Sequence, residues 1–170
     1  AEGARLYTIG HMQDISDRKH AEEALRVSEE RYALAVGGAH DALWDWDIEK
    51  GVIYTSPRMS EILDIRLPKD MWTAGELYRY VHPDNVERFK RETKAHLRGE
   101  SEYFECEFRV AGNDENPRWV LQRGLARRDS SGRAYRMAGS ATDITDRKRA
   151  EDALKESEER LRAVIDNVID

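Results

Sequence analysis

Two segments of the chain carry the apolar spacing of helices that pair with other helices. Over residues 146–170, apolar and small side chains recur at alternating steps of four and three. The steps fall on Ala150, Leu154, Ser157, Leu161, Val164 and Val168. Residues 16–36 repeat the steps, and Gly37 and Gly38 are expected to end that helix. A stripe this narrow stabilises a lone helix poorly.

The stripe predicts a parallel two-stranded coiled coil formed with a second copy of the chain. The expected seam comprises Leu25, Ser28, Tyr32, Leu154, Ser157 and Leu161. The alternative is a solvated helix that leans on its own domain.

The block between the two helices alternates apolar and polar positions with the period of β-strands. Residues 42–48 and 52–56 flank a Lys50-Gly51 turn and predict a hairpin, and residues 103–110, 118–128 and 134–144 predict three more strands. Pro57 and Pro83 suit the starts of helices over residues 57–63 and 83–98, the second ended by Gly99. This order predicts an α+β domain: a five-stranded antiparallel sheet with helices on one face.

The two helical segments are copies of each other. Residues 14–31 (DISDRKHAEEALRVSEER) and 143–160 (DITDRKRAEDALKESEER) are identical at thirteen of eighteen positions. A repeat that flanks one domain-sized block indicates a domain between two connector helices of a tandem array. We therefore expect the end of a preceding domain in residues 1–15, a connector helix in 16–36, the central domain in 37–145, and a connector helix in 146–170 leading into the next domain.

Several motifs of the central domain match one known family. They are WDWD with its KG turn, Tyr54-Thr55-Ser56, SEIL, VHPD, Arg118-Trp119, RGLARRDSSG and GSATDITDRKRAE. Residues 31–149 resemble a PAS domain with its C-terminal PAC portion, and residues 5–15 resemble the last strand of a preceding PAS domain. The chain departs from the family at Asp64, where glycine is usual, and in the longer loop 112–117.

The resemblance implies the PAS fold and a sensory role in signal transduction. A small ligand would lie between the helices and the inner sheet face, near Trp44, Trp72, Phe89, Trp119, Leu121 and Met137. The alternative is that these large side chains simply fill the core.

The triplet Asp143, Ile144 and Thr145 would join the sensor to the outgoing helix. Asp143 can pair with a basic residue or with backbone donors, Ile144 can pack on the core, and Thr145 can cap the helix. The resemblance implies a tandem-PAS sensor histidine kinase as the whole protein. A diguanylate cyclase or phosphodiesterase and a ligand-free dimerisation spacer are the alternatives.

The charge of the chain limits its partners. The formal net charge is -6 and the pI about 5.5, whereas nucleic acids and anionic membranes need a basic face. No apolar run reaches the length of a membrane span. One cysteine, Cys106, suits a reducing compartment. We therefore expect a cytoplasmic module without nucleic-acid or membrane contacts.

Chemistry-bearing residues are sparse. His82 suits a structural place before a helix, and the polar segment KAHLRGE around His96 disfavours haem. Cys106 lies in a strand pattern and lacks the Asn-Cys-Arg-Phe-Leu-Gln motif of photoreactive flavin-binding relatives. We find no metal site, evident cofactor, nucleophile elbow or phosphate loop. The signatures of histidine kinases and diguanylate cyclases are also missing, so this chain is not expected to be an enzyme, and any catalytic output would follow Asp170.

Overall fold

The computed structural model describes residues 16–64, 71–111 and 116–169. The chain divides into two compact units, Ala1–Ala39 and His40–Asp170. The expected end of a preceding domain, in residues 1–15, lies outside the described residues.

The described part of the first unit is one helix, α1 (Ser16–Ala39). The expectation that Gly37 and Gly38 end this helix is wrong. The chain leaves the helix at His40, which takes the left-handed backbone conformation with φ 57°. Along the helix, Arg26 pairs with Glu23 at 2.6 Å and with Glu30 at 2.5 Å. These neighbours, three or four residues apart, support a helix whose surface is mostly polar.

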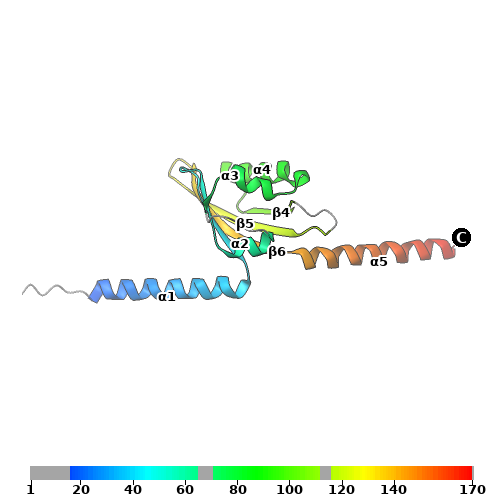
Figure 1. Cartoon of the computed structure of the whole chain (residues 1–170), viewed down its shortest axis with the longest axis horizontal. Coiled ribbons are helices and arrows are strands. Elements are labelled where there is room, and N and C mark those ends of the chain that lie inside the picture. The colour runs from blue at the N-terminus through cyan, green and yellow to red at the C-terminus, as the bar shows by residue number, and fades with distance from the viewer. Residues whose placement is uncertain (1–15, 65–70, 112–115, 170) are drawn as a thin grey trace, which may run out of the picture. The chain divides into compact units, whose positions relative to one another are not determined.

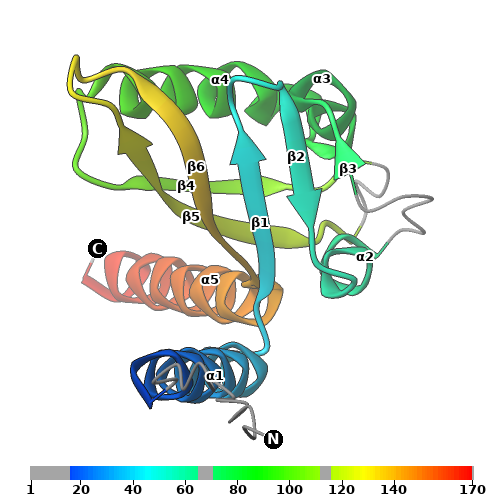
Figure 2. The same ribbon diagram turned by 90° about the vertical axis from the view of Figure 1, so that its left-hand side faces the viewer.

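The second unit is built on one antiparallel sheet (Figures 1 and 2). Its strands are β1 (Ala42–Asp47), β2 (Val52–Thr55), β3 (Met71–Trp72), β4 (Phe104–Arg109), β5 (Trp119–Arg128) and β6 (Ala134–Asp143). The order across the sheet is β3-β2-β1-β6-β5-β4. The five expected strands are present. A sixth, the short β3, pairs with the edge of β2 through Ile53 opposite Trp72.

The helices between β2 and β4 cover one face of the sheet (Figure 2). They are α2 (Arg58–Leu63), α3 (Ala74–Leu77), the 3-10 turn η1 (Tyr78–Tyr80) and α4 (Pro83–Arg98). Local chemistry sets the ends of α4: Pro83 occupies its first turn, and Gly99 leaves it with φ 83°. The hydroxyl of Thr73 and the carboxylate of Glu76 form a capping box on α3.

Strand alternation sends one set of side chains toward these helices. Trp44 from β1, Phe104 and Phe108 from β4 and Met137 from β6 are buried there. Gly124 of β5 makes room for the Trp44 ring, because a Cβ at this position would lie 2.5 Å from that ring. A Cβ at Gly139, its partner on β6, would instead collide with the backbone of Arg123. The core thus lies between the sheet and the helices.

The last helix, α5 (Thr145–Ile169), follows β6 with a single residue between them (Figure 1). Every described side chain from Arg149 to Ile165 is exposed. The helix is therefore attached to the domain at its start, and from Arg149 to Ile165 it presents its side chains to solvent.

Candidate functional site

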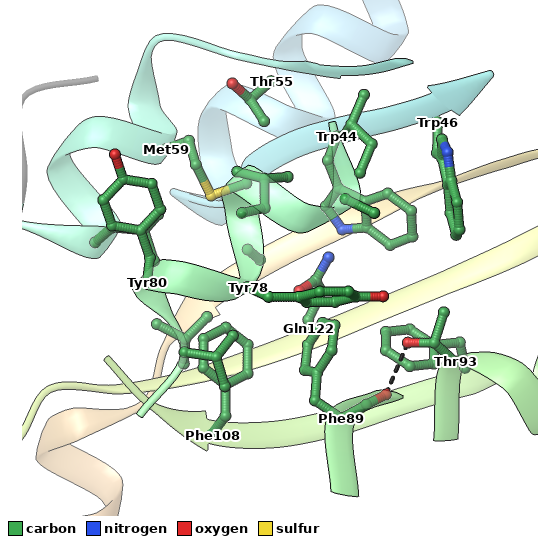
Figure 3. Close-up of a pocket in the computed structure, with 18 of the residues that line it drawn as sticks. Trp44, Trp46, Thr55, Met59, Tyr78, Tyr80, Phe89, Thr93, Phe108 and Gln122 are labelled. Atoms are coloured by element: carbon green, nitrogen blue, oxygen red, sulfur yellow. Dashed lines mark hydrogen bonds between the residues drawn. The ribbon is translucent and has the colours of Figure 1, made fainter. Parts of the chain in front are cut away.

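A cavity lies in the core between the inner sheet face and the helices (Figure 3). Its volume is about 70 Å³. Its lining is Trp44, Trp46, Ile53, Thr55, Met59, Leu63, Ala74, Leu77, Tyr78, Tyr80, Val81, Phe89, Thr93, Phe104, Phe108, Val120, Gln122, Met137 and Ala141. Figure 3 places Tyr78 and Gln122 centrally, between Trp44 on one side and Phe89 and Phe108 on the other.

The polar groups of the lining differ in how they are satisfied. The Thr93 hydroxyl donates to the Phe89 carbonyl at 2.8 Å, and the Thr55 hydroxyl accepts from the Trp72 indole at 3.2 Å. The indole N–H of Trp46 is buried without a hydrogen-bond partner among the described residues. Burial raises the pKa of the Tyr78 phenol, so this group stays neutral at physiological pH.

Three of the six expected pocket residues line the cavity: Trp44, Phe89 and Met137. Trp72 is buried in the same core, 4% exposed, and contacts the cavity wall through its hydrogen bond to Thr55.

The structure places Trp119 and Leu121 on the opposite face of the sheet, which corrects their assignment to the pocket. Leu121 is paired with Glu107, and Lys148 lies 5.3 Å from the centre of the Trp119 ring. Their neighbours Val120 and Gln122 point inward instead. Strand alternation requires this division once Val120 faces the core.

The sequence reasoning missed other lining residues, among them Trp46, Tyr78 and Gln122. The WDWD alternation carried a signal for Trp46, because it lies two residues after Trp44 and therefore shares its face. Tyr78 belongs to a short turn between helices, where no periodic pattern indicates a direction.

The joint between β6 and α5 is fixed by short hydrogen bonds. One carboxylate oxygen of Asp143 accepts from the Thr145 backbone N–H at 2.9 Å and from its hydroxyl at 2.6 Å. The Thr145 hydroxyl oxygen also accepts the Trp119 N–H at 3.0 Å, so it ties the helix to β5 instead of capping helix amides. Ile144 is buried, 7% exposed, and its N–H donates to the Trp119 carbonyl.

Two charged side chains anchor this joint to the rest of the domain. Arg118 donates to the Glu61 and Ile62 carbonyls at the end of α2, at 2.7 and 3.3 Å, and lies 3.4 Å from Asp143. Glu107 of β4 pairs with Lys148 at 2.6 Å and also with Arg147, both in the first turns of α5. These hydrogen bonds, that of Lys148 foremost, lower the pKa of the Glu107 carboxyl.

His96, Cys106 and His82 all have structural surroundings. Nε2 of His96 accepts the Ala126 N–H at 3.0 Å, and Nδ1 contacts the Ser101 carbonyl at 3.1 Å. Both ring nitrogens are therefore engaged within the fold. Burial raises the pKa of the Cys106 thiol to about 11, so the unreactive thiol form dominates. Nδ1 of His82 accepts the Asp84 N–H at the start of α4.

The expected seam residues occupy exposed positions on the two long helices. Leu25 of α1 is 60% exposed, and Leu154 and Leu161 of α5 are 62% and 61% exposed. Ser28 and Ser157 are exposed as well. The side chain of Tyr32 lies outside the described part of the structure.

Two features are absent from the residues that the structure describes. No group of three or more His, Cys, Asp or Glu side chains is placed to hold a metal ion. No helix in the described ranges is long and apolar enough to cross a membrane.

The fold and the amino-acid sequence together define the family. Residues 52–141 match the family profile described as PAS fold. This chain therefore belongs to the PAS-fold family. It is similar to the solved structure of a sensory box histidine kinase/response regulator from Burkholderia thailandensis, with 40% sequence identity and a TM-score of 0.66. That match covers 78% of this chain and 98% of the solved one.

Longer relatives contain a similar segment. The two-component sensor PprA of Pseudomonas aeruginosa is 26% identical over 97% of this chain and 18% of its own length. The probable diguanylate cyclase DgcE of Escherichia coli is 28% identical over 98% of this chain and 15% of its own length. The chain thus spans less than a fifth of either relative.

Proposed function

We propose that the chain is a sensory module in which the cavity takes a small molecule and the β6–α5 joint passes the response to a downstream output domain. The observation that carries this proposal is one chain of contacts. It runs from the cavity wall through Arg118 and Asp143 to the start of α5.

The contacts begin at α2. This helix contributes Met59 and Leu63 to the cavity, and its last carbonyls, Glu61 and Ile62, accept from the Arg118 guanidinium. A ligand that displaces α2 would move these acceptors relative to Arg118. The same guanidinium is paired with Asp143, so the shift would reach the residue that holds the first turn of α5.

The output of this movement is a change in how two copies of α5 pack. The exposed apolar stripe on α5 would be buried by pairing with the same helix of a second chain. Ala150 and Ser157 weaken the seam, so two packings of similar free energy are available to a small tilt or rotation. In this proposal residues 16–36 and 146–170 are connectors, residues 37–145 are the sensor, and residues 1–15 end a preceding PAS domain.

We assign the whole protein to the cytoplasmic sensor histidine kinases first, and to the diguanylate cyclases or phosphodiesterases second. The similarity to a solved sensory box histidine kinase supports the first assignment, and the similarity to a probable diguanylate cyclase supports the second. This chain itself would have no catalytic activity.

One observation favours a second role, that of a ligand-free dimerisation spacer. Seven aromatic side chains occupy much of the core and leave a cavity of only about 70 Å³. A spacer would fix the rotational orientation of the connector helices relative to each other without responding to a ligand.

The seam provides the test of the sensory proposal. Ser157→Leu fills it with an apolar residue and should lock the output of the full-length protein in one state, measured as autophosphorylation with ATP and as cyclic-di-GMP synthesis from GTP. Glu159→Leu, on the opposite side of α5, is the matched control. Output that Ser157→Leu leaves unchanged would contradict transmission through the seam.

A further inference from the structure

Gln122 contributes the one side-chain amide of the described cavity lining, from the inner face of β5. Its partners across the sheet are small: Cys106 on β4 and Ala141 on β6, and Ala141 is in turn opposite Ala42 on β1. These short side chains leave the space over the sheet open around Gln122, which Figure 3 shows at the centre of the cavity. The amide therefore forms part of the cavity wall.

Part of the Gln122 surface is accessible although its surroundings are closed. Cys106, Val120 and Ala141 are each at most 4% exposed, whereas Gln122 is only half-buried. Strand β5 is paired on both sides, and the helices cover the inner face of the sheet. The accessible surface of this inward-pointing side chain therefore faces the cavity.

The Gln122 amide has no hydrogen-bond partner among the described residues of the protein. The lining threonines differ, because Thr93 donates to the Phe89 carbonyl and Thr55 accepts from the Trp72 indole. A polar group inside a core costs free energy unless a hydrogen bond replaces its contacts with water. The missing partner must offer a donor to the Gln122 Oε1 and an acceptor to its Nε2.

A ligand amide has this combination of groups. A carboxamide or a lactam carries an N–H beside a C=O, and a glutamine side chain can bind such an edge through both of its own polar atoms. The lining also excludes charge, since none of its described residues is Asp, Glu, Lys, Arg or His. An ionised group would lose its hydration here without gaining a partner charge.

Aromatic rings provide the wall for the rest of the ligand. Phe104 and Phe108 lie two residues to either side of the β4 position opposite Gln122. Phe89 of α4 meets both rings edge to face, with ring centroids 5.7 and 5.2 Å apart. An aromatic or other apolar part of a ligand can pack on this cluster while its amide reaches Gln122.

We infer that the cavity binds an uncharged compound whose carboxamide or lactam group pairs with the Gln122 amide through two hydrogen bonds. The ligand N–H donates to the Gln122 Oε1, and the Gln122 Nε2 donates to the ligand carbonyl. The inference rests on the proposed sensory function of this cavity and adds the ligand class.

Three probes of nearly the same shape separate the contributions. Benzamide has the donor and the acceptor, acetophenone has the acceptor alone, and benzoate is charged. Each is titrated into the purified chain and followed by ¹⁵N–¹H NMR. Benzamide should bind about tenfold more tightly than acetophenone, which leaves the Gln122 Oε1 unpaired. It should also bind at least about tenfold more tightly than benzoate. Benzamide should shift the side-chain NH₂ resonances of Gln122.

Gln122→Met keeps the length of the side chain and removes the amide. The fold should tolerate it, because the amide makes no hydrogen bond to the described residues. The preference for benzamide over acetophenone should disappear in this variant, a change that altered packing alone would not produce. Leu121→Met, on the outer face of the same strand, is the matched control and should keep the preference. If Gln122→Met unfolds the chain, the Gln122 resonances of the unsubstituted protein still decide the question.

Three results would overturn the inference: equal affinities for benzamide and acetophenone, benzoate binding as tightly as benzamide, or no binding of any probe. The seam experiment on the full-length protein separates this failure from that of the proposed function. An output locked by Ser157→Leu without benzamide binding removes only the ligand class. Benzamide binding with the predicted preference, but an output insensitive to the seam, supports the ligand class and removes the sensory proposal.

Discussion

Asp64 carries backbone strain at the end of α2. The residue takes the left-handed conformation, φ 54° and ψ 41°, at the position where the family usually has glycine. The Cβ of a non-glycine residue is disfavoured in this region by about 1–2 kcal/mol. The carboxylate lies 3.6 Å from Arg118 but is 78% exposed, so the ion pair offsets little of this strain.

Asp64→Gly should therefore stabilise the domain by about 0.5–1 kcal/mol, after allowance for the greater freedom of glycine in the unfolded chain. Urea unfolding monitored by tryptophan fluorescence measures the change. Asp64→Ala removes the same carboxylate but keeps the Cβ, and it should give no gain. Equal stabilisation by both variants would show that the charge, and not the backbone, matters.

His96 makes the stability depend on pH. Its ring is 1% exposed, and Nε2 accepts the Ala126 N–H, so protonation at Nε2 would break that hydrogen bond inside the core. Burial, with a smaller contribution from the nearby Arg128, lowers the pKa of the imidazole. The guanidinium of Arg128 itself binds the carbonyls of His96 and Leu97.

A lowered histidine pKa means that the unfolded chain binds the proton more readily than the folded one. Stability should therefore fall as the pH drops below the ordinary histidine pKa of about 6.5, and level off below the lowered folded pKa. Unfolding midpoints measured from about pH 7.5 to about pH 5 test this. His96→Gln should flatten that part of the curve, whereas His20→Gln, exposed on α1, should not.

At the level of the elements, the β6–α5 joint depends on contacts from two other strands. Glu107 on β4 holds Lys148 and Arg147, and the backbone of Trp119 on β5 binds Ile144 and Thr145. Helix α5 therefore starts from a strand paired on both sides, and its first turns lie against the outer face of β4 and β5.

Glu107→Gln should loosen the first turn of α5. A partly exposed ion pair contributes about 1 kcal/mol, so hydrogen exchange of the Lys148 amide should become about fivefold faster at neutral pH. Because the folded pKa of Glu107 is lowered, this contribution is present above the ordinary carboxylate pKa and is lost as the pH falls through the folded value. Glu105→Gln removes the neighbouring pair with Arg123 and should leave this amide unchanged.

Local signals in the sequence were sufficient to predict most of the helices and strands. Pro83 and Gly99 bound α4 as predicted, and the alternation in β4 placed Phe104, Cys106 and Phe108 on one face. The two-residue β3 was missed, because its existence depends on pairing with distant β2.

The candidate site was harder to predict than the elements. Trp119, Val120 and Leu121 are three consecutive apolar residues, so alternation alone does not say which face is inner. The register with β4 and β6 decides it, and turns Val120 and Gln122 toward the cavity. The contacts of Arg118 with α2 also join residues more than fifty positions apart, for which a single sequence gives no signal.

At the scale of the whole molecule, signal transmission depends on α5 forming a coiled coil with the same helix of a second chain. Leu154, Leu161 and Val164 are 58–62% exposed along one stripe, and they are surrounded by charged side chains. Apolar surface of this arrangement is buried efficiently by the same helix of a second chain in parallel register. Identical seam positions of the two copies then face each other.

Site-specific disulfide formation tests this arrangement most directly. Ser157→Cys lies in the seam and Glu159→Cys on the opposite side of the helix, while the native Cys106 is buried. Under mild oxidation of the purified chain, the account predicts rapid covalent dimers for Ser157→Cys and little product for Glu159→Cys. Equal rates for the two variants, or a monomer throughout, would contradict it.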